Sequence, residues 1–121
     1  MGSPAARRAV PKTPVRFKAK LFRGLSDPAR LSLMEALLDG PKSVGELVLE
    51  TGLSQPGVSQ HLNCLRCCGL VLSRRQGRRV YYRIASPRML RLLRHADGVL
   101  EEVAERIRAC EKYQVSSGGR R

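Results

Sequence analysis

Cysteine is the residue type in this chain with the clearest capacity for chemistry. Cys64, Cys67 and Cys68 lie within five residues of one another, and Cys110 follows much later. Residues three or four apart on a helix share a face, so Cys64 can act together with Cys67 or with Cys68. Thiolates select soft or borderline cations such as Cd(II), Pb(II), Hg(II), Zn(II) and Cu(I). Small, soft cysteine side chains also fill gaps in apolar cores, and this spacing by itself favours neither role.

A metal site of three sulfurs needs a third donor in addition to a pair on one helix. Cys110 is the obvious donor, and it can reach the pair only through tertiary folding or from a partner subunit. His61 lies one turn before Cys64, and we interpret it as structural or DNA-facing. His95 is interpreted as a surface or interface residue.

The charge of the chain indicates a polyanionic partner, either nucleic acid or a membrane surface. The 121 residues contain 23 Lys and Arg against 10 Asp and Glu, which gives a formal net charge of +13. Nine arginines and no carboxylate fall between residues 51 and 96. Unopposed arginine binds phosphate and releases counterions, so nucleic acid is favoured over a merely solvated basic surface.

Length and composition predict one domain with an aliphatic core, because only 4% of the residues are aromatic and Trp is absent. No apolar run approaches the roughly 18 residues of a membrane helix. The first residues lack the apolar stretch of a signal peptide. We therefore expect a cytoplasmic protein with reduced thiols and no membrane partner. Residues 1–14 are predicted to form a flexible basic arm, 15–112 the folded domain and 113–121 a flexible tail.

The spacing of apolar residues and the capping residues predict four helices in the first half of the chain. The first covers residues 15 to about 24, and Asp27 with the proline after it starts the second. Ser43 opens the third helix in a capping box. The fourth begins after Ser54 and ends at Gly69.

The pattern then changes to that of strands. Residues 70–75 and 78–84 are β-prone and flank a turn at residues 76–77, which predicts a hairpin with arginines at its tip. A last helix begins at Pro87 and keeps apolar residues three and four apart over about five turns. This order predicts a mostly α fold with a β-hairpin wing, the winged helix-turn-helix. The last helix is more apolar than one small domain can cover, so we expect a homodimer through the first and last helices.

Two sets of polar residues are candidates for contacts to double-stranded operator DNA. In a winged helix-turn-helix the fourth predicted helix is the recognition helix, which lies in the major groove. Near its start, Gln can bond bidentately to adenine, and Ser can bond bases or phosphate. The arginines of the hairpin would contact phosphate or the minor groove and add affinity more than specificity. The alternative is that both sets are solvated surface. The candidates are Ser54, Gln55, Ser59, Gln60 and His61 in the helix, and Arg74, Arg75, Arg78 and Arg79 in the hairpin.

In three segments the chain resembles the ArsR/SmtB family of bacterial metal-sensing repressors. These segments are LSDPARL (residues 25–31), LSQPGVSQHL (53–62) and GRRVYY (77–82). The segment CLRCCGLV (64–71) resembles the cadmium- and lead-sensing branch of that family. The resemblance implies a homodimer that represses a metal-efflux or resistance operon and releases DNA when metal binds. It also implies Cys64, Cys68 and Cys110 as the ligands.

The chain departs from the family pattern at three points. The cysteine pair that precedes the recognition helix in arsenic sensors is absent. Ser86, Arg88 and Val99 fall near the positions of the Asp and His zinc ligands that other members carry on the last helix. Cys67 is additional, so the pair Cys64 and Cys67 competes with Cys64 and Cys68. The extra thiol also leaves Hg(II) open, with Zn(II) as a further candidate beside Cd(II) and Pb(II).

Metal sensing has rivals of other kinds. Three thiols beside a DNA-reading surface favour ligands over core packing, but a redox or sulfide sensor of the same fold would use a cysteine pair that oxidises to a disulfide. A regulator without any ligand is a second rival. An enzyme is disfavoured, because the chain has only two histidines and no phosphate-binding loop.

Overall fold

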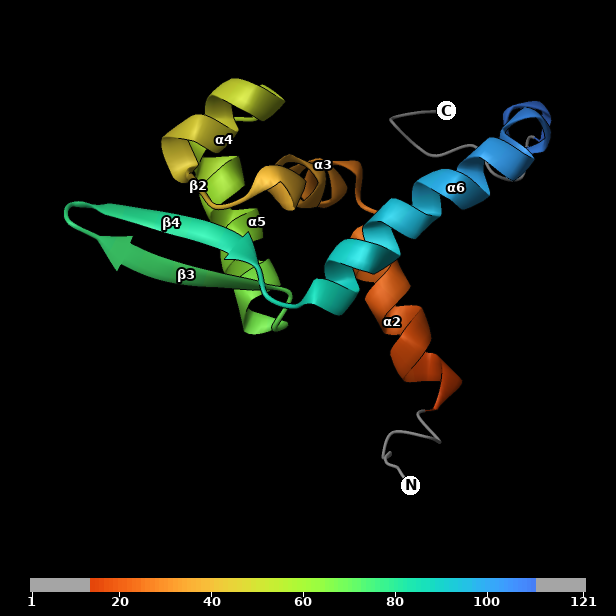
Figure 1. Cartoon of the computed structure of the whole chain (residues 1–121), viewed down its shortest axis with the longest axis horizontal. Coiled ribbons are helices and arrows are strands. Elements are labelled where there is room, and N and C mark those ends of the chain that lie inside the picture. The colour runs from red at the N-terminus through yellow and green to blue at the C-terminus, as the bar shows by residue number, and fades with distance from the viewer. Residues whose placement is uncertain (1–13, 111–121) are drawn as a thin grey trace.

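The computed structural model describes residues 14–110 and confirms a mostly helical chain that carries a β wing (Figure 1). The proposed arm, except Pro14, and the whole proposed tail lie outside the described residues. The elements in chain order are α2 (Val15–Leu25), α3 (Pro28–Ala36), the 3-10 turn η1 (Leu37–Asp39), β2 (Lys42–Ser43), α4 (Val44–Thr51), α5 (Gln55–Cys67), β3 (Val71–Gln76), β4 (Arg79–Ile84) and α6 (Pro87–Ala109).

Side-chain caps start most of the helices where the sequence predicts. The Asp27 carboxylate accepts hydrogen bonds from the amides of Ala29 and Arg30, at 2.9 and 3.5 Å, and begins α3. The capping box of α4 is complete, since Ser43 Oγ accepts from the Glu46 amide and the Glu46 carboxylate accepts from the Ser43 amide. Each cap satisfies amides that have no partner within the helix. Helix α3 ends at Ala36, where the chain tightens into η1.

The wing is a three-stranded antiparallel sheet in the order β2-β4-β3. The hairpin was predicted, but its turn lies one residue later, at residues 77–78, and Gln76 ends β3 opposite Arg79. Gly77 takes a φ of +64°, which residues with a side chain adopt at a cost. Strand β2 was not predicted. It pairs Lys42 with Tyr82, forty positions apart, and so joins the start of α4 to the wing.

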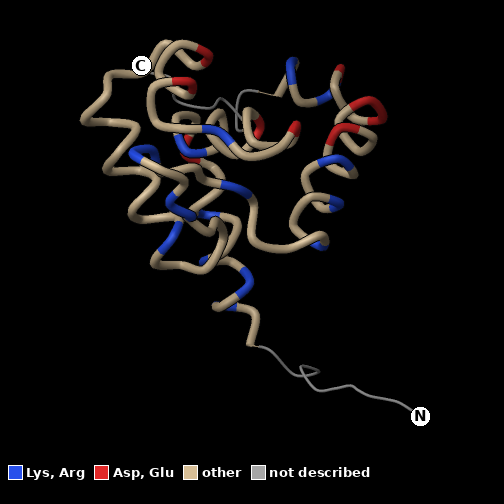
Figure 2. The backbone as a smooth tube through the Cα atoms, turned by 60° about the vertical axis from the view of Figure 1, so that its left-hand side comes forward, with Lys and Arg blue, Asp and Glu red and all other residues tan. Residues whose placement is uncertain are grey.

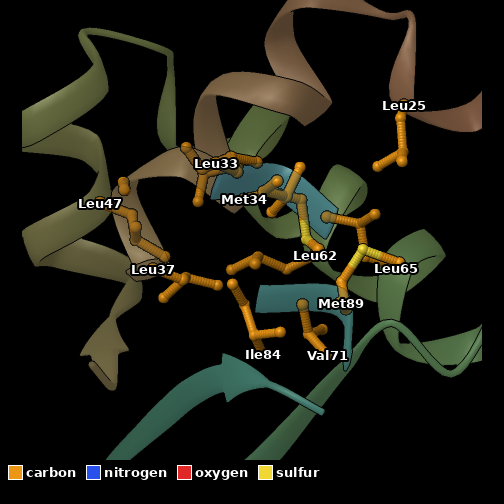
Figure 3. Packing of buried hydrophobic residues seen from close by; sticks show 13 residues of the cluster. Leu25, Leu33, Met34, Leu37, Leu47, Leu62, Leu65, Val71, Ile84 and Met89 are labelled. Carbon is orange, nitrogen blue, oxygen red and sulfur yellow. The ribbon is translucent and has the colours of Figure 1, made fainter. Parts of the chain in front are cut away.

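Aliphatic side chains and two methionines fill the core, as the low aromatic content predicts (Figure 3). Helix α5 presents Val58, Leu62 and Leu65 to this core, and α3, α4, the base of the wing and the start of α6 pack around it. The core therefore fixes how α5 lies against both α4 and the sheet. Its members are Leu25, Leu33, Met34, Ala36, Leu37, Leu47, Val58, Leu62, Leu65, Val71, Ile84, Met89 and Leu93.

Helices α2 and α6 project from the molecule on the side opposite to the wing (Figure 1). Only the first part of α6 is anchored, by Met89 and Leu93, and further along Val99 and Leu100 are 58% and 50% exposed. On α2, Phe17 and Phe22 are about as exposed as these. Isolated apolar side chains on a surface are ordinary, but a periodic series along a projecting helix is typical of an interface. None of the helices in residues 14–110 is both long enough and apolar enough to span a membrane.

Candidate nucleic-acid interface and thiol cluster

Helices α4 and α5 form the helix-turn-helix. Gly52 ends α4 with a φ of +76°, and Ser54 caps α5 by accepting a hydrogen bond from the Gly57 amide at 3.1 Å. A Cβ atom at Gly57 would lie 2.9 Å from Ser54 Oγ, so a side chain there would require the capping hydroxyl to shift. The Ser54 oxygen thus has a structural role, while its hydroxyl proton stays free to donate.

The polar face of α5 points away from the core, as its helical periodicity predicts. Gln55, Ser59 and Gln60 are exposed, and His61 is half-buried. Val58, Leu62 and Leu65 on the opposite face are fully buried or nearly so. Further along, Arg66 donates to the Asn63 side chain at 2.8 Å. The first two turns of α5 therefore expose amide and hydroxyl groups of the kinds that can bond to base edges.

The wing presents its arginines to solvent on both faces. Arg74, Arg75, Arg78 and Arg79 are all exposed, and within residues 14–110 none of them forms an ion pair. Directly opposed residues of an antiparallel pair share a face. The pairing of Arg74 with Tyr81 and of Arg75 with Val80 therefore puts Arg74 on one face of the hairpin and Arg75 on the other.

The acidic residues of the described chain lie toward one side of the molecule. In the view of Figure 2, Asp and Glu lie in the upper part, whereas the lower part carries Lys and Arg alone. The ion pairs among the described residues fit this separation, because they join only residues between Asp27 and Glu50 or at the end of α6. Nine arginines of residues 51–96 are consequently left without a neutralising partner in the described chain.

The thiol cluster lies at the C-terminal end of α5. Cys64 and Cys67 are in the last turns of the helix and Cys68 caps it. All three are free and exposed, so they do not fill gaps in the protomer core. The interpretation as core cysteines is therefore wrong for these three residues.

Cys110 is half-buried at the far end of α6. The near end of α6 adjoins the thiol cluster, because the Ala85 amide donates to the Leu70 carbonyl at 3.0 Å, just before α6 and just after α5. A helix of 23 residues is about 34 Å long at 1.5 Å per residue, and α6 runs outward without turning back (Figure 1). Cys110 is thus remote from Cys64 and Cys68 of its own protomer. No group of three or more metal-ligating side chains is assembled among residues 14–110 of one chain.

One group of polar residues was not anticipated from the sequence. The outer face of the wing holds a pocket of about 350 Å³ lined by Pro41, Arg74, Gln76, Tyr81 and Arg83. The alternation of the strand could have placed Arg74, Gln76, Tyr81 and Arg83 on one face. Pro41 could not have been added, because it comes from the loop before the unpredicted strand β2.

Comparison with known proteins finds bacterial transcriptional regulators as relatives. The family model described as bacterial regulatory protein, arsR family, matches residues 27–73. The chain is 38% identical to a probable mercury resistance operon repressor of Streptomyces lividans, over 93% of this chain and 94% of that protein. It is 45% identical to the HTH-type transcriptional regulator CmtR of Mycobacterium tuberculosis, over 62% of this chain and 64% of that protein.

Solved structures agree with this likeness. The crystal structure of Rv0081 from M. tuberculosis matches with a TM-score of 0.72 and 38% identity, over 82% of this chain and all of that one. The homodimeric winged helix-turn-helix DNA-binding domain of Mb0332 from Mycobacterium bovis matches with a TM-score of 0.65 and 30% identity, over 80% of this chain and 95% of that one.

Proposed function

The chain belongs to the arsR family of bacterial regulatory proteins, and we propose that it is a transcriptional repressor that a thiophilic metal ion releases from operator DNA. The observation that carries this proposal is the placement of three exposed thiols on the recognition helix itself. A ligand held there acts on the element that reads DNA. The relatives named for mercury resistance and as CmtR support a regulator of this kind.

In the proposed complex, α5 enters the major groove and the wing lies over the adjoining backbone. Gln55, Ser59 and Gln60 would contact base edges, with Ser54 and His61 at the margins of that face. Arg74, Arg75, Arg78 and Arg79 would supply phosphate contacts, which position the protein but do not read sequence. Two copies joined through the exposed apolar faces of α2 and α6 would present two recognition helices to two half-sites.

The chemistry of the donors fits a soft cation. Cys64 and Cys68 are one helical turn apart and would hold Cd(II) or Pb(II) as thiolates, with Hg(II) and Zn(II) as further candidates. Cys67 is the alternative partner of Cys64. Because Cys110 is remote within its own protomer, we assign the third thiolate to Cys110 of the other subunit. Thiolate ligands must lose their protons, so the affinity for metal should fall as the pH falls.

Metal releases the DNA if the metal-bound dimer binds DNA more weakly than the metal-free dimer does. Cys68 and Gly69 end α5, and tying this end to the other subunit would constrain the orientation of the recognition helix. A coupling of about 1–3 kcal/mol is typical of allosteric proteins and would correspond here to roughly 5- to 150-fold in DNA affinity.

The second candidate function is thiol-based redox or sulfide sensing by the same fold. It is favoured by the exposure of all three helix cysteines, which makes them open to oxidation as well as to metal. In that case a disulfide or persulfide, formed under an external oxidant or sulfur donor, would replace the metal as the signal.

A DNA-binding titration on reduced protein tests the proposal. Fluorescence anisotropy of labelled operator would follow release, and the ultraviolet absorbance of metal thiolates would be recorded in the same cuvette. Wild type is expected to bind Cd(II) or Pb(II) and leave the DNA. Cys64→Ser and Cys110→Ser are expected to bind DNA as wild type does and to remain bound when metal is added.

Cys67→Ser is the matched control, since it removes another exposed thiol from the same helix. It should retain metal-induced release; if it loses release while Cys68→Ser retains it, the helix pair is Cys64 and Cys67. Release by peroxide or persulfide alone, without any response to metal, would establish the redox alternative. Release of Cys64→Ser or Cys110→Ser by Cd(II) or Pb(II) would overturn the three-thiolate site.

A further inference from the structure

The outer face of the wing carries a basic pocket that extends beyond the proposed operator contacts. Arg74 is one of those contacts, whereas Gln76, Tyr81 and Arg83 are not. Strand register puts Arg74 opposite Tyr81 and Gln76 opposite Arg79, with Arg83 two residues beyond Tyr81 on the same face. The other face carries the ends of the strands, Val71 and Ile84, into the core beside α5. The pocket is therefore separated from the recognition helix by the thickness of the sheet.

The lining of the pocket is suited to an anion with several oxygens. Two guanidinium groups, the amide of Gln76 and the phenol of Tyr81 all supply hydrogen-bond donors, and Pro41 closes one side with apolar surface. No carboxylate lines the pocket in the described part of the chain. One guanidinium group can donate two parallel hydrogen bonds to two oxygens of a phosphate, which gives geometric as well as electrostatic complementarity.

The carboxylates closest in sequence to Pro41 and β2 pair with Lys42 and not with the pocket arginines. Lys42 lies beside Pro41, and its ammonium group bonds to the Glu50 carboxylate at 2.6 and 2.8 Å and lies 3.8 Å from that of Asp39. Across residues 14–110, neither Arg74 nor Arg83 has a carboxylate partner. Their charges in the pocket are thus left available to a ligand.

We propose that this outer wing pocket is a phosphate-binding site centred on Arg83 and outside the recognition helix. It shares Arg74 with the backbone contacts proposed above. The phosphate comes either from the backbone of DNA that continues past the operator and bends around the wing, or from a small phosphorylated solute. Both sources present the same tetrahedral oxyanion to Arg74 and Arg83. The site does not involve the cysteines, so the test of phosphate binding does not depend on whether metal releases the DNA.

The test compares Arg83→Ala with Arg91→Ala, which removes an equally charged, exposed arginine from α6 outside the pocket. Inorganic pyrophosphate is titrated into each protein at low salt by calorimetry. The salt dependence of DNA binding is then measured on an operator duplex and on the same duplex with added flanking base pairs. Circular dichroism confirms the fold of both variants.

A small-solute site predicts that Arg83→Ala weakens pyrophosphate binding about tenfold or more, with DNA binding unchanged. A flanking-DNA site predicts that Arg83→Ala lowers the slope of log K against log salt by about 1 on the longer duplex alone. Tyr81→Phe, which removes only the hydroxyl, should weaken the same interaction less. The proposal is overturned if Arg83→Ala matches Arg91→Ala in every measurement. Equal losses on both duplexes would also overturn it, because Arg83 would then belong to the operator contact.

Discussion

Individual side chains in this protein divide between those that hold the fold and those left free for partners. Cys64, Cys67 and Cys68 are exposed and make no contribution to the protomer core. Their replacement by serine should therefore leave stability nearly unchanged, which makes functional tests on them interpretable. Ser54 shows the opposite case, since its capping hydrogen bond to Gly57 means that its removal affects both the helix and its proposed DNA contact.

Glu35 of α3 marks a contact between the core domain and the projecting helix. Glu35 is largely exposed, but the desolvation that it does undergo raises its pKa, and the nearby charge of Asp97 on α6 raises the pKa further. A carboxyl group whose pKa is higher in the folded state than in the unfolded state gives stability that is present in full below the unfolded pKa. This stability is lost as the pH rises through the folded value.

Asp97→Asn should consequently raise the melting temperature slightly near pH 7, where Glu35 is ionised. The gain should shrink at about pH 3, because a protonated Glu35 carboxyl group no longer repels the charge of Asp97. Thermal unfolding at the two pH values measures this difference. Glu101→Gln is the control, since it removes one negative charge from the same helix. An equal, pH-dependent gain from Glu101→Gln would show that the general charge of α6, not its contact with Glu35, sets the effect.

At the scale of elements, the helix-turn-helix depends on how α4 is held against α5. Leu47 is fully buried, whereas Leu49, two residues later on the same helix, is 86% exposed. Burial of one face of α4 thus positions the recognition helix, and the other face is open to solvent.

Leu47→Ala should lower the free energy of unfolding by about 2–5 kcal/mol, because it leaves a cavity beside α5. Leu49→Ala should change it by less than about 0.5 kcal/mol. Urea unfolding followed by circular dichroism gives both values, and the loss in Leu47→Ala should be accompanied by weaker operator binding. Similar losses in the two variants would contradict the packing described for α4.

Local signals explain why most elements could be predicted. Asp27, Ser43 and Ser54 each cap the helix that they were predicted to start, and Ser86 caps the last helix directly before its predicted start at Pro87. These starts can be read from the sequence because a cap is a contact within three residues. Strand β2 could not be predicted in this way, since two residues have no periodicity of their own and pair with a strand forty positions away. The direction of α6 is likewise a tertiary property, so the distance of Cys110 from the other thiols was not accessible from spacing.

At the scale of the whole molecule, the proposed DNA-binding surface and the proposed dimer interface lie at opposite ends. The recognition face and wing are at one end, and the apolar surfaces of α2 and α6 that would join two subunits are at the other (Figure 1). The thiol cluster lies between them, next to the start of α6. A site shared between subunits would therefore connect the proposed dimer interface directly to the element that reads DNA.

A mixed dimer of Cys64→Ser and Cys110→Ser protomers, purified through two different affinity tags, tests this central claim most directly. If Cys64 and Cys68 of one subunit act with Cys110 of the other, the mixed dimer contains one complete site, although neither variant homodimer contains any. It should recover about half of the wild-type metal–thiolate absorbance per dimer and regain release from operator DNA on addition of Cd(II). A mixed dimer that binds metal no better than the two variant homodimers would contradict a site shared between subunits.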